Sequence, residues 1–374
     1  MRLRLASTAQ RVVQVGLQRF ITAMRVERGS ARRGSHVIAL HLVRQVERQP
    51  GPLPARHVPR PFHVRGRALA AGDVPLPLAP LVPAGHETVG RLRVRAAVAA
   101  DLVVLAKLPV RGGIKVRAAY ADAQLTVGID SSGDLARSQR ILQSHSVVGG
   151  VDPTLIPQLL SAGSLQGGAC YIIERWVHGR PVATGDRLAQ AAPEILRRLR
   201  AVHLRHGLEQ LQLLAWWNSA QQERWEKTVE TGIVPRCVAD EVETRLAHPQ
   251  RTVATSWCHG DLVASNIIET EGGLVLIDWE RASQAPVMLD AARLHLFSGD
   301  PARTLADIQR HWTWRPAPIE MAPGHQLVLA HAYQLSAYPA RRAGLAAHPR
   351  AGVYEKQARR QVTRLAQVLD LTPQ

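Results

Sequence analysis

The sequence predicts an α+β fold in two lobes, a small β-rich N-lobe over residues 85–175 and a larger, mainly helical C-lobe over residues 176–374. A chain of 374 residues is long enough for two lobes. The first segment contains short apolar runs that are typical of strands, such as Leu102–Pro109. In the second, apolar residues recur at helical spacing, as they do at Ile195, Leu199 and Val202.

Residues 1–84 are predicted to form a basic, Pro/Arg-rich and poorly ordered head. The first 100 residues carry 17 arginines, no lysine and four acidic residues, so they hold +13 of the net charge of +17. Residues 49–84 have weak periodicity and much Pro, Arg and Ala, which is typical of a linker.

Three explanations of this basic head stay open. In the first, the head binds an anionic partner such as nucleic acid or a membrane surface. In the second, it is a targeting peptide, because Met1–Arg25 is Arg-rich and acid-free. In the third, it is an extension upstream of the true start. The excess of Arg over Lys favours the last, since GC-rich coding keeps spurious reading frames open.

Two carboxylates and an amide are spaced around a predicted β-hairpin. Residues 267–277 contain two short apolar runs separated by Thr-Glu-Gly-Gly, a strand–turn–strand pattern. If the hairpin is symmetric about Gly272, Asn266 and Asp278 lie opposite each other at its open end. Asp261 lies one short loop upstream.

These residue types suit phosphoryl transfer. Mg²⁺ takes oxygen ligands and is usually held by one or two side chains together with substrate phosphates. Transfer needs positioning and charge neutralisation more than covalent help. A metal-bound phosphate would meet Asn266 and Asp278, while the Asp261 carboxylate would accept the proton of an acceptor hydroxyl.

The motif His259-Gly260-Asp261 with Asn266, followed by Ile277–Glu280, resembles the aminoglycoside phosphotransferase and choline kinase branch of the protein-kinase-like fold. Pro286 and Asp290 match a further element of that pattern, P-x-x-x-D. The resemblance implies a two-lobed kinase-like fold, with ATP as phosphoryl donor. It also implies that Asp261 is the catalytic base and that Asn266 and Asp278 are ligands of Mg²⁺.

A short apolar strand, Cys170–Val177, runs into a Gly-Pro break at Gly179 and Pro181. It resembles the hinge between the lobes, where backbone groups hold the adenine, which implies that Glu174 and Trp176 bind the nucleotide. An ordinary core strand is the alternative. The helix that follows, with Pro193 near its start, ends near His203, for which the resemblance implies a structural role.

The resemblance requires a lysine on an N-lobe strand to hold the nucleotide phosphates. Lys107 ends an apolar run that alternates as a strand does, whereas Lys115 follows Gly-Gly and suits a turn, so Lys107 is favoured. The next helix carries Ser138 or Gln139 where the family usually has a Glu that pairs with this lysine. No convincing phosphate-binding glycine loop is present.

The function expected from these features is an ATP-dependent phosphotransferase that acts on a hydroxyl of a small molecule. A catalytically weak nucleotide-binding relative, acting as sensor or scaffold, is the alternative, and a nucleic-acid binder is disfavoured despite the basic head. The acceptor, the choice between ATP and GTP and the oligomeric state stay open. The tryptophans that follow the hinge are expected either to line an acceptor pocket or to belong to the core (Trp216, Trp217, Trp225, Trp312 and Trp314).

Location and charge add two expectations. No apolar run reaches the roughly 18–20 residues of a membrane helix, and three cysteines without C-x-x-C spacing indicate reduced thiols, so the chain is expected to be cytoplasmic. The acids that would bind a polycationic aminoglycoside are not concentrated. They are helix-spaced, as on a solvated face (Glu223, Glu226, Glu230, Asp240, Glu241 and Glu243).

Overall fold

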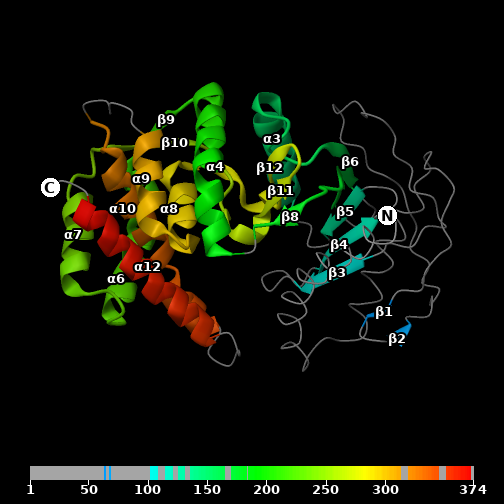
Figure 1. Cartoon of the computed structure of the whole chain (residues 1–374). Helices are drawn as coiled ribbons and strands as arrows, with labels where there is room; N and C mark the ends of the chain where they lie inside the picture. The colour runs from blue at the N-terminus through cyan, green and yellow to red at the C-terminus, as the bar shows by residue number, and fades with distance from the viewer. Residues whose placement is uncertain are drawn as a thin grey trace. The chain divides into compact units, whose positions relative to one another are not determined.

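The computed structural model describes residues 135–164, 170–182, 184–312, 319–344 and 351–371, together with five earlier strands. Within the basic head it describes β1 (His63–Val64) and β2 (Arg67–Ala68), which pair with each other, and the rest of that segment lies outside the described residues. The chain divides into two compact units (Figure 1). One is β-rich and the other is mainly helical, so the predicted α+β fold class is confirmed.

The β-rich unit contains a five-stranded antiparallel sheet in the order β3-β4-β5-β7-β6. One helix, α3 (Leu135–Val151), connects β5 to β6. The side chains of Tyr171, Ile172 and Ile173 in β7 are buried. The strands are β3 (Leu102–Lys107), β4 (Ile114–Tyr120), β5 (Leu125–Asp130), β6 (Leu159–Ser164) and β7 (Cys170–Arg175).

The two candidate lysines both lie in strands. Lys107 is the last residue of β3, as expected, and pairs with Ile114. The expectation that Lys115 lies in a turn is wrong, because it is the second residue of β4 and pairs with Ala106. Residues that pair directly share a face and neighbours along a strand alternate, so Lys107 and Lys115 lie on opposite faces of the sheet. Their side chains lie outside the described part of the chain.

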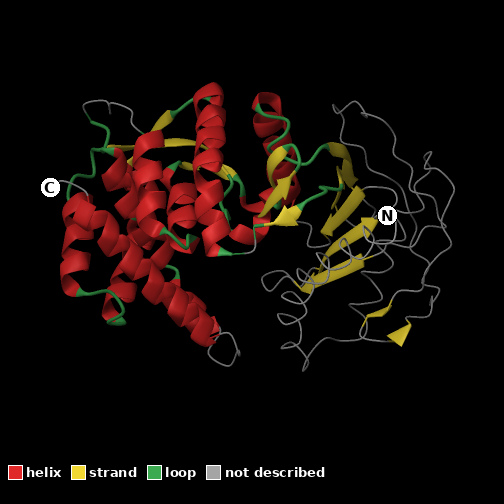
Figure 2. Ribbon diagram, in the orientation of Figure 1, coloured by secondary structure: helices red, strands yellow, loops and turns green. Residues whose placement is uncertain are grey.

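The helical unit is built from helices that pack on one another and on two three-stranded antiparallel sheets (Figure 2). The long helices are α4 (Gly185–His206), α6 (Ser219–Glu230), α7 (Arg236–Leu246), α8 (Met288–Phe297), α9 (Pro301–His311), α10 (Pro323–Leu335) and α12 (Ala351–Leu371), and the short ones are α5 (Leu213–Trp216) and α11 (Tyr338–Gly344). The strands are β9 (Glu209–Gln212), β10 (Thr252–Cys258) and β13 (Ser283–Pro286) in one sheet and β8 (Arg180–Pro181), β11 (Ile267–Thr270) and β12 (Gly273–Leu276) in the other.

Helix α4 begins earlier than its proline suggested. The Thr184 side chain caps the helix by accepting a hydrogen bond from the Arg187 backbone N–H, so Pro193 lies inside the helix and not near its start. The apolar residues at helical spacing, such as Ile195 and Leu199, are buried as their pattern predicts. Tertiary packing of this apolar face stabilises the helix on both sides of Pro193, although proline usually disrupts a helix.

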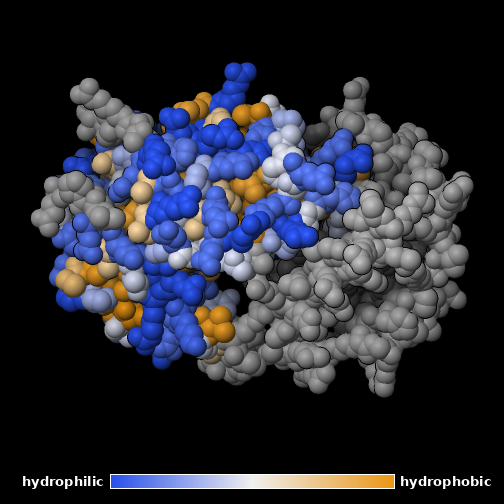
Figure 3. Space-filling model, viewed as in Figure 1, coloured by the Kyte–Doolittle hydropathy of each residue, from blue (hydrophilic) through white to orange (hydrophobic). Residues whose placement is uncertain are grey.

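The strand that leads to the candidate site, β10, lies in the middle of its sheet between β9 and β13 and is buried along its whole length. Its buried polar residues Thr255 and Ser256 donate their hydroxyls to the backbone carbonyls of Glu209 and Gly207. The visible face of the helical unit is mostly hydrophilic, with apolar residues in small separate patches (Figure 3). In the described ranges, no helix is long and apolar enough to cross a membrane.

Candidate active site

The loop after β10 is organised around a buried histidine. The His259 side chain is fully buried, and its ring packs against Trp279 with centroids 4.5 Å apart. Its Nε2 lies 3.0 Å from the carbonyl oxygen of Ile277, and its Nδ1 lies 3.3 Å from the backbone nitrogen of Asp261. Since a carbonyl only accepts and an N–H only donates, both bonds require the proton on Nε2. His259 therefore ties this loop to the end of the hairpin.

A second buried group, Asp290 at the start of α8, fixes the same loop. Its Oδ2 accepts a 2.6 Å hydrogen bond from the His259 backbone N–H, and its Oδ1 accepts a 3.0 Å bond from the Gly260 backbone N–H. Burial raises the pKa of Asp290, while His259 and the two backbone N–H groups oppose the rise. The match of Asp290 to the P-x-x-x-D element thus corresponds to a structural clamp.

Gly260 occupies a position that only glycine suits. Its φ is +77°, in the left-handed region. A Cβ built on Gly260 would overlap the carbonyl oxygen of Arg281. The loop can therefore pass close to Arg281 before it presents Asp261.

The Asp261 carboxylate is positioned but open, with its side chain 29% exposed. The Arg293 Nη2 lies 3.4 Å from Oδ1, and the Arg281 Nε lies 4.0 Å from Oδ2. Both guanidinium groups therefore lie beside an accessible carboxylate on a fixed loop.

Asn266 is held beside Asp261. It ends the short helix η2 (Ala264–Asn266) and its side chain is buried. The Nδ2 of Asn266 donates a 3.0 Å hydrogen bond to the backbone carbonyl of Asp261. The amide oxygen of Asn266 accepts a 3.5 Å hydrogen bond from the Ser265 hydroxyl.

The hairpin is present, but its register differs from the prediction by one residue. Strands β11 and β12 pair Ile267 with Leu276 and Thr270 with Gly273, so the centre lies between Glu271 and Gly272. The Ile277 backbone N–H donates a 2.9 Å bond to the Asn266 carbonyl. Asn266 is therefore opposite Ile277 and not opposite Asp278, because the turn has two residues and not an odd number.

Asp278 begins the next turn, the short helix η3 (Trp279–Arg281). It has φ 70° and ψ 51°, and it is the single non-glycine residue with positive φ among those described. Non-glycine residues in this region carry strain of about 1–3 kcal/mol and concentrate at functional sites. The left-handed conformation turns the chain at the end of the hairpin where Asn266 lies.

The oxygen atoms of Asn266 and Asp278 fit the preference of Mg²⁺ for one or two side chains plus phosphates. In the part of the chain that the structure describes, no group of three or more His, Cys, Asp or Glu residues could hold a metal ion by itself.

The predicted nucleotide-binding residues Glu174 and Trp176 lie in the β-rich unit. The Glu174 carboxylate lies 3.0 Å from Nε2 of His145 in α3. The backbone carbonyl of Glu174 accepts a 3.5 Å hydrogen bond from the Thr126 hydroxyl. Trp176 follows β7 and is half-buried. Helix α3 contains no acidic residue, so it offers no carboxylate to pair with Lys107.

Two residues of the site were missed by the sequence analysis, Arg281 and Arg293. Arg281 directly follows the Ile277–Glu280 motif. Arg293 is three residues after Asp290, a spacing that places both on one face of α8. That spacing was the available signal, but it becomes informative only once Asp290 is known to touch the loop that carries Asp261.

The described tryptophans belong to the core. Trp216 stacks on Tyr333 with centroids 5.3 Å apart, Trp217 meets Trp225 edge-on at 6.3 Å, and the Trp225 side chain is fully buried. Trp312 is buried against the His203 ring, and Trp314 lies outside the described residues.

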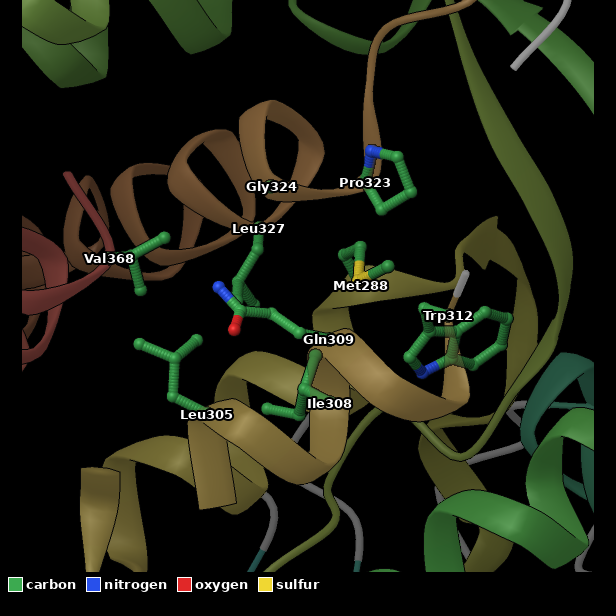
Figure 4. Close-up of a pocket in the computed structure, with 9 residues that line it drawn as sticks. All are labelled: Met288, Leu305, Ile308, Gln309, Trp312, Pro323, Gly324, Leu327 and Val368. Atoms are coloured by element: carbon green, nitrogen blue, oxygen red, sulfur yellow. The ribbon is translucent and has the colours of Figure 1, made fainter. Parts of the chain in front are cut away.

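A small apolar hollow of about 20 Å³ lies among α8, α9, α10 and α12 (Figure 4). Trp312, Met288 and Leu305 contribute to its wall, and Gln309 is its polar member. Asp261, which we expect to face the acceptor, is not part of this wall.

Comparison with known proteins identifies a family for this chain. A family model described as "Phosphotransferase enzyme family" matches residues 131–323, just over half of the chain. No curated protein matches the chain.

Similar solved structures have low identity and TM-scores under 0.5. The choline kinase LicA from Streptococcus pneumoniae is 18% identical, with 71% of this chain and 94% of that chain covered and a TM-score of 0.44. The GDP complex of an aminoglycoside 2′-phosphotransferase is 14% identical, with 71% and 93% covered and a TM-score of 0.46. A choline/ethanolamine kinase family protein from Mesorhizobium loti is 13% identical, with 72% and 89% covered and a TM-score of 0.44.

Proposed function

Because the chain belongs to the phosphotransferase enzyme family, we propose that it is a small-molecule kinase that transfers the γ-phosphoryl group of ATP to a hydroxyl. The observation that carries this proposal is the Asp261 carboxylate. It is accessible and lies beside two arginines, on a loop that His259 and Asp290 fix. The amide of Asn266 is bonded to the same loop.

In the proposed reaction, the acceptor oxygen attacks the γ-phosphorus as the bond to the β–γ bridging oxygen breaks, and ADP leaves. The proton of the acceptor hydroxyl passes to the Asp261 carboxylate. Asn266 and Asp278 would hold Mg²⁺, which supplies neutralisation of the phosphate charge. Lys107, Glu174 and the backbone near Trp176 would bind the nucleotide.

A second candidate function, a nucleotide-binding scaffold with weak catalysis, is favoured by α3. That helix has no acidic residue, so the Lys–Glu pair usual in this fold cannot form through it. Nucleotide would still bind, but transfer would be slow or absent.

The test compares Asp261→Asn with the wild type, and uses Asp370→Asn, an exposed site on α12, as a charge-matched control. We expect phosphorylation of the best hydroxyl acceptor to fall by about 10²–10⁴-fold in Asp261→Asn, while the Kd of Mg-ATP changes little. The control should match the wild type. A wild type that binds Mg-ATP but phosphorylates no hydroxyl compound would support the scaffold, and an equally fast Asp261→Asn would refute the assignment of the base.

A further inference from the structure

Two arginines lie beside the candidate catalytic base in the helical unit. Arg281 ends η3 and Arg293 lies on α8. They lie 4.0 Å and 3.4 Å from the oxygens of the Asp261 carboxylate. Burial lowers the pKa of Arg293, Asp261 opposes this, and the charges of Arg341 on α11 and of Arg281 lower it further. Positive charge is therefore concentrated beside Asp261.

The donors of Arg281 and Arg293 are not used up by Asp261. At 3.4 and 4.0 Å the contacts are ion pairs and not hydrogen bonds. No hydrogen bond joins either guanidinium to another described residue. A guanidinium has five N–H donors, so the Arg281 and Arg293 side chains, 57% and 12% exposed, retain donors for a ligand.

The acidic residues that would attract a cationic acceptor are engaged elsewhere. On α6 and α7 most of them form ion pairs with basic residues of their own helix, so these helices present mixed charge. The pairs are Glu223 with Lys227, Asp240 and Glu243 with Arg236, and Glu241 with Arg245. The expectation of a solvated face on these helices is thus supported.

We propose that the acceptor is an anion, a hydroxyl compound that also carries a carboxylate or phosphate group. Arg281 and Arg293 would bind that group while its hydroxyl faces Asp261, and the charge of Arg341 would add to the attraction. The proposal rests on the proposed kinase function and names its substrate class. The positive charge also offsets the repulsion between an anionic acceptor and the nucleotide phosphates, which otherwise opposes their approach.

The first experiment uses four three-carbon hydroxyl compounds that differ in charge: glycerate, glycerol 3-phosphate, glycerol and 3-amino-1,2-propanediol. ADP release is measured with each at saturating Mg-ATP. We expect kcat/KM for glycerate, glycerol 3-phosphate or both to exceed that for glycerol by at least about tenfold, with the amine poorest. The two anions distinguish a carboxylate site from a phosphate site.

The second experiment removes positive charge near the base. Arg281→Gln and Arg341→Gln should each raise the KM of the anionic acceptor about tenfold. Arg341→Gln leaves both ion pairs of Asp261 in place, so it should keep the KM of Mg-ATP and the KM of glycerol within about twofold, a split that a merely structural role would not produce. Arg342→Gln serves as the matched control, because it removes the same charge from the same helix. The charge of Arg342 contributes to lowering the pKa of Glu355.

The inference fails if glycerol or the amine is phosphorylated as well as the anions. It also fails if an enzyme that phosphorylates another hydroxyl compound phosphorylates neither anion, or if Arg281→Gln and Arg341→Gln leave the KM of the anion unchanged. In each of these outcomes the enzyme still transfers phosphate, which separates them from failure of the proposed function, shown by a wild type that phosphorylates no hydroxyl compound.

Discussion

Asp290 accepts a 2.6 Å hydrogen bond from the backbone N–H of His259, a residue 31 positions earlier in the chain. The bond joins the first turn of α8 to the loop that leaves β10. Since the carboxylate is buried and receives a second backbone N–H from Gly260, it holds the main chain beside Asp261 in one conformation.

We expect Asp290→Asn to destabilise the protein and slow catalysis together. The amide keeps the shape but places an NH₂ group against one of two backbone N–H donors, and an unsatisfied buried donor costs about 1–3 kcal/mol. Denaturant unfolding should show this loss, and kcat should fall because Asp261 moves. Asp370→Asn, an exposed site, should change neither quantity. Wild-type kcat in Asp290→Asn would show that the clamp does not position the base.

Alanine substitutions at two glycines can distinguish the cost of backbone strain from the cost of steric overlap. Gly260 and Gly232 both have left-handed φ, +77° and +71°, but a Cβ meets Arg281 at the first and nothing within 4 Å at the second. Gly232→Ala should therefore cost about 1–2 kcal/mol of unfolding free energy from φ alone. Gly260→Ala should cost more and also reduce kcat. Equal losses in the two variants would mean that the approach of Arg281 is not constraining.

The metal assignment is tested by Asp278→Asn. Asparagine tolerates the left-handed conformation that Asp278 adopts, so the fold should persist while one ligand charge is lost. We expect the Kd of Mg-ATP, measured by calorimetry, to rise by at least about 10–100-fold, the cost of disturbing even indirect metal contacts. Binding of nucleotide without Mg²⁺ should change far less. Asp278→Asn with wild-type affinity for Mg-ATP would remove Asp278 from the metal site.

Acid stability should depend on His203. Burial lowers its pKa to about 4 in the folded protein, against about 6.5 when unfolded. Between these values the unfolded state binds the proton more readily, so the unfolding free energy is greatest above pH 6.5 and falls as the pH drops towards 4. The full loss is about 3 kcal/mol.

The measurement is the unfolding free energy of wild type and His203→Phe across that pH range. Phenylalanine keeps a ring against Trp312 but cannot be protonated, so the variant should lose less stability at low pH. Some slope will remain, because burial also lowers the pKa of His295 to about 3. Exposed His248→Gln is the control. Parallel curves for wild type and His203→Phe would contradict this account.

Local patterns in the sequence were sufficient for the elements near the site. The glycine turn between two apolar runs predicted the hairpin of β11 and β12, and alternation placed Lys107 on a strand, because both signals act between neighbouring residues. The fold class followed from the same patterns. The roles of Asp261, Asn266 and Asp278 rest on the motif and stay predictions for the experiments above.

Tertiary contacts decided the rest. The hairpin register is set by a two-residue turn and by the Asn266–Ile277 hydrogen bond, which composition alone does not reveal. Helix α4 extends past Pro193 because its apolar face is buried. Arg293 reaches Asp261 only because Asp290 anchors α8 to the loop after β10. The sequence by itself therefore determined the local elements and the order of the motif, whereas the charge around the base depends on packing between segments far apart in the chain.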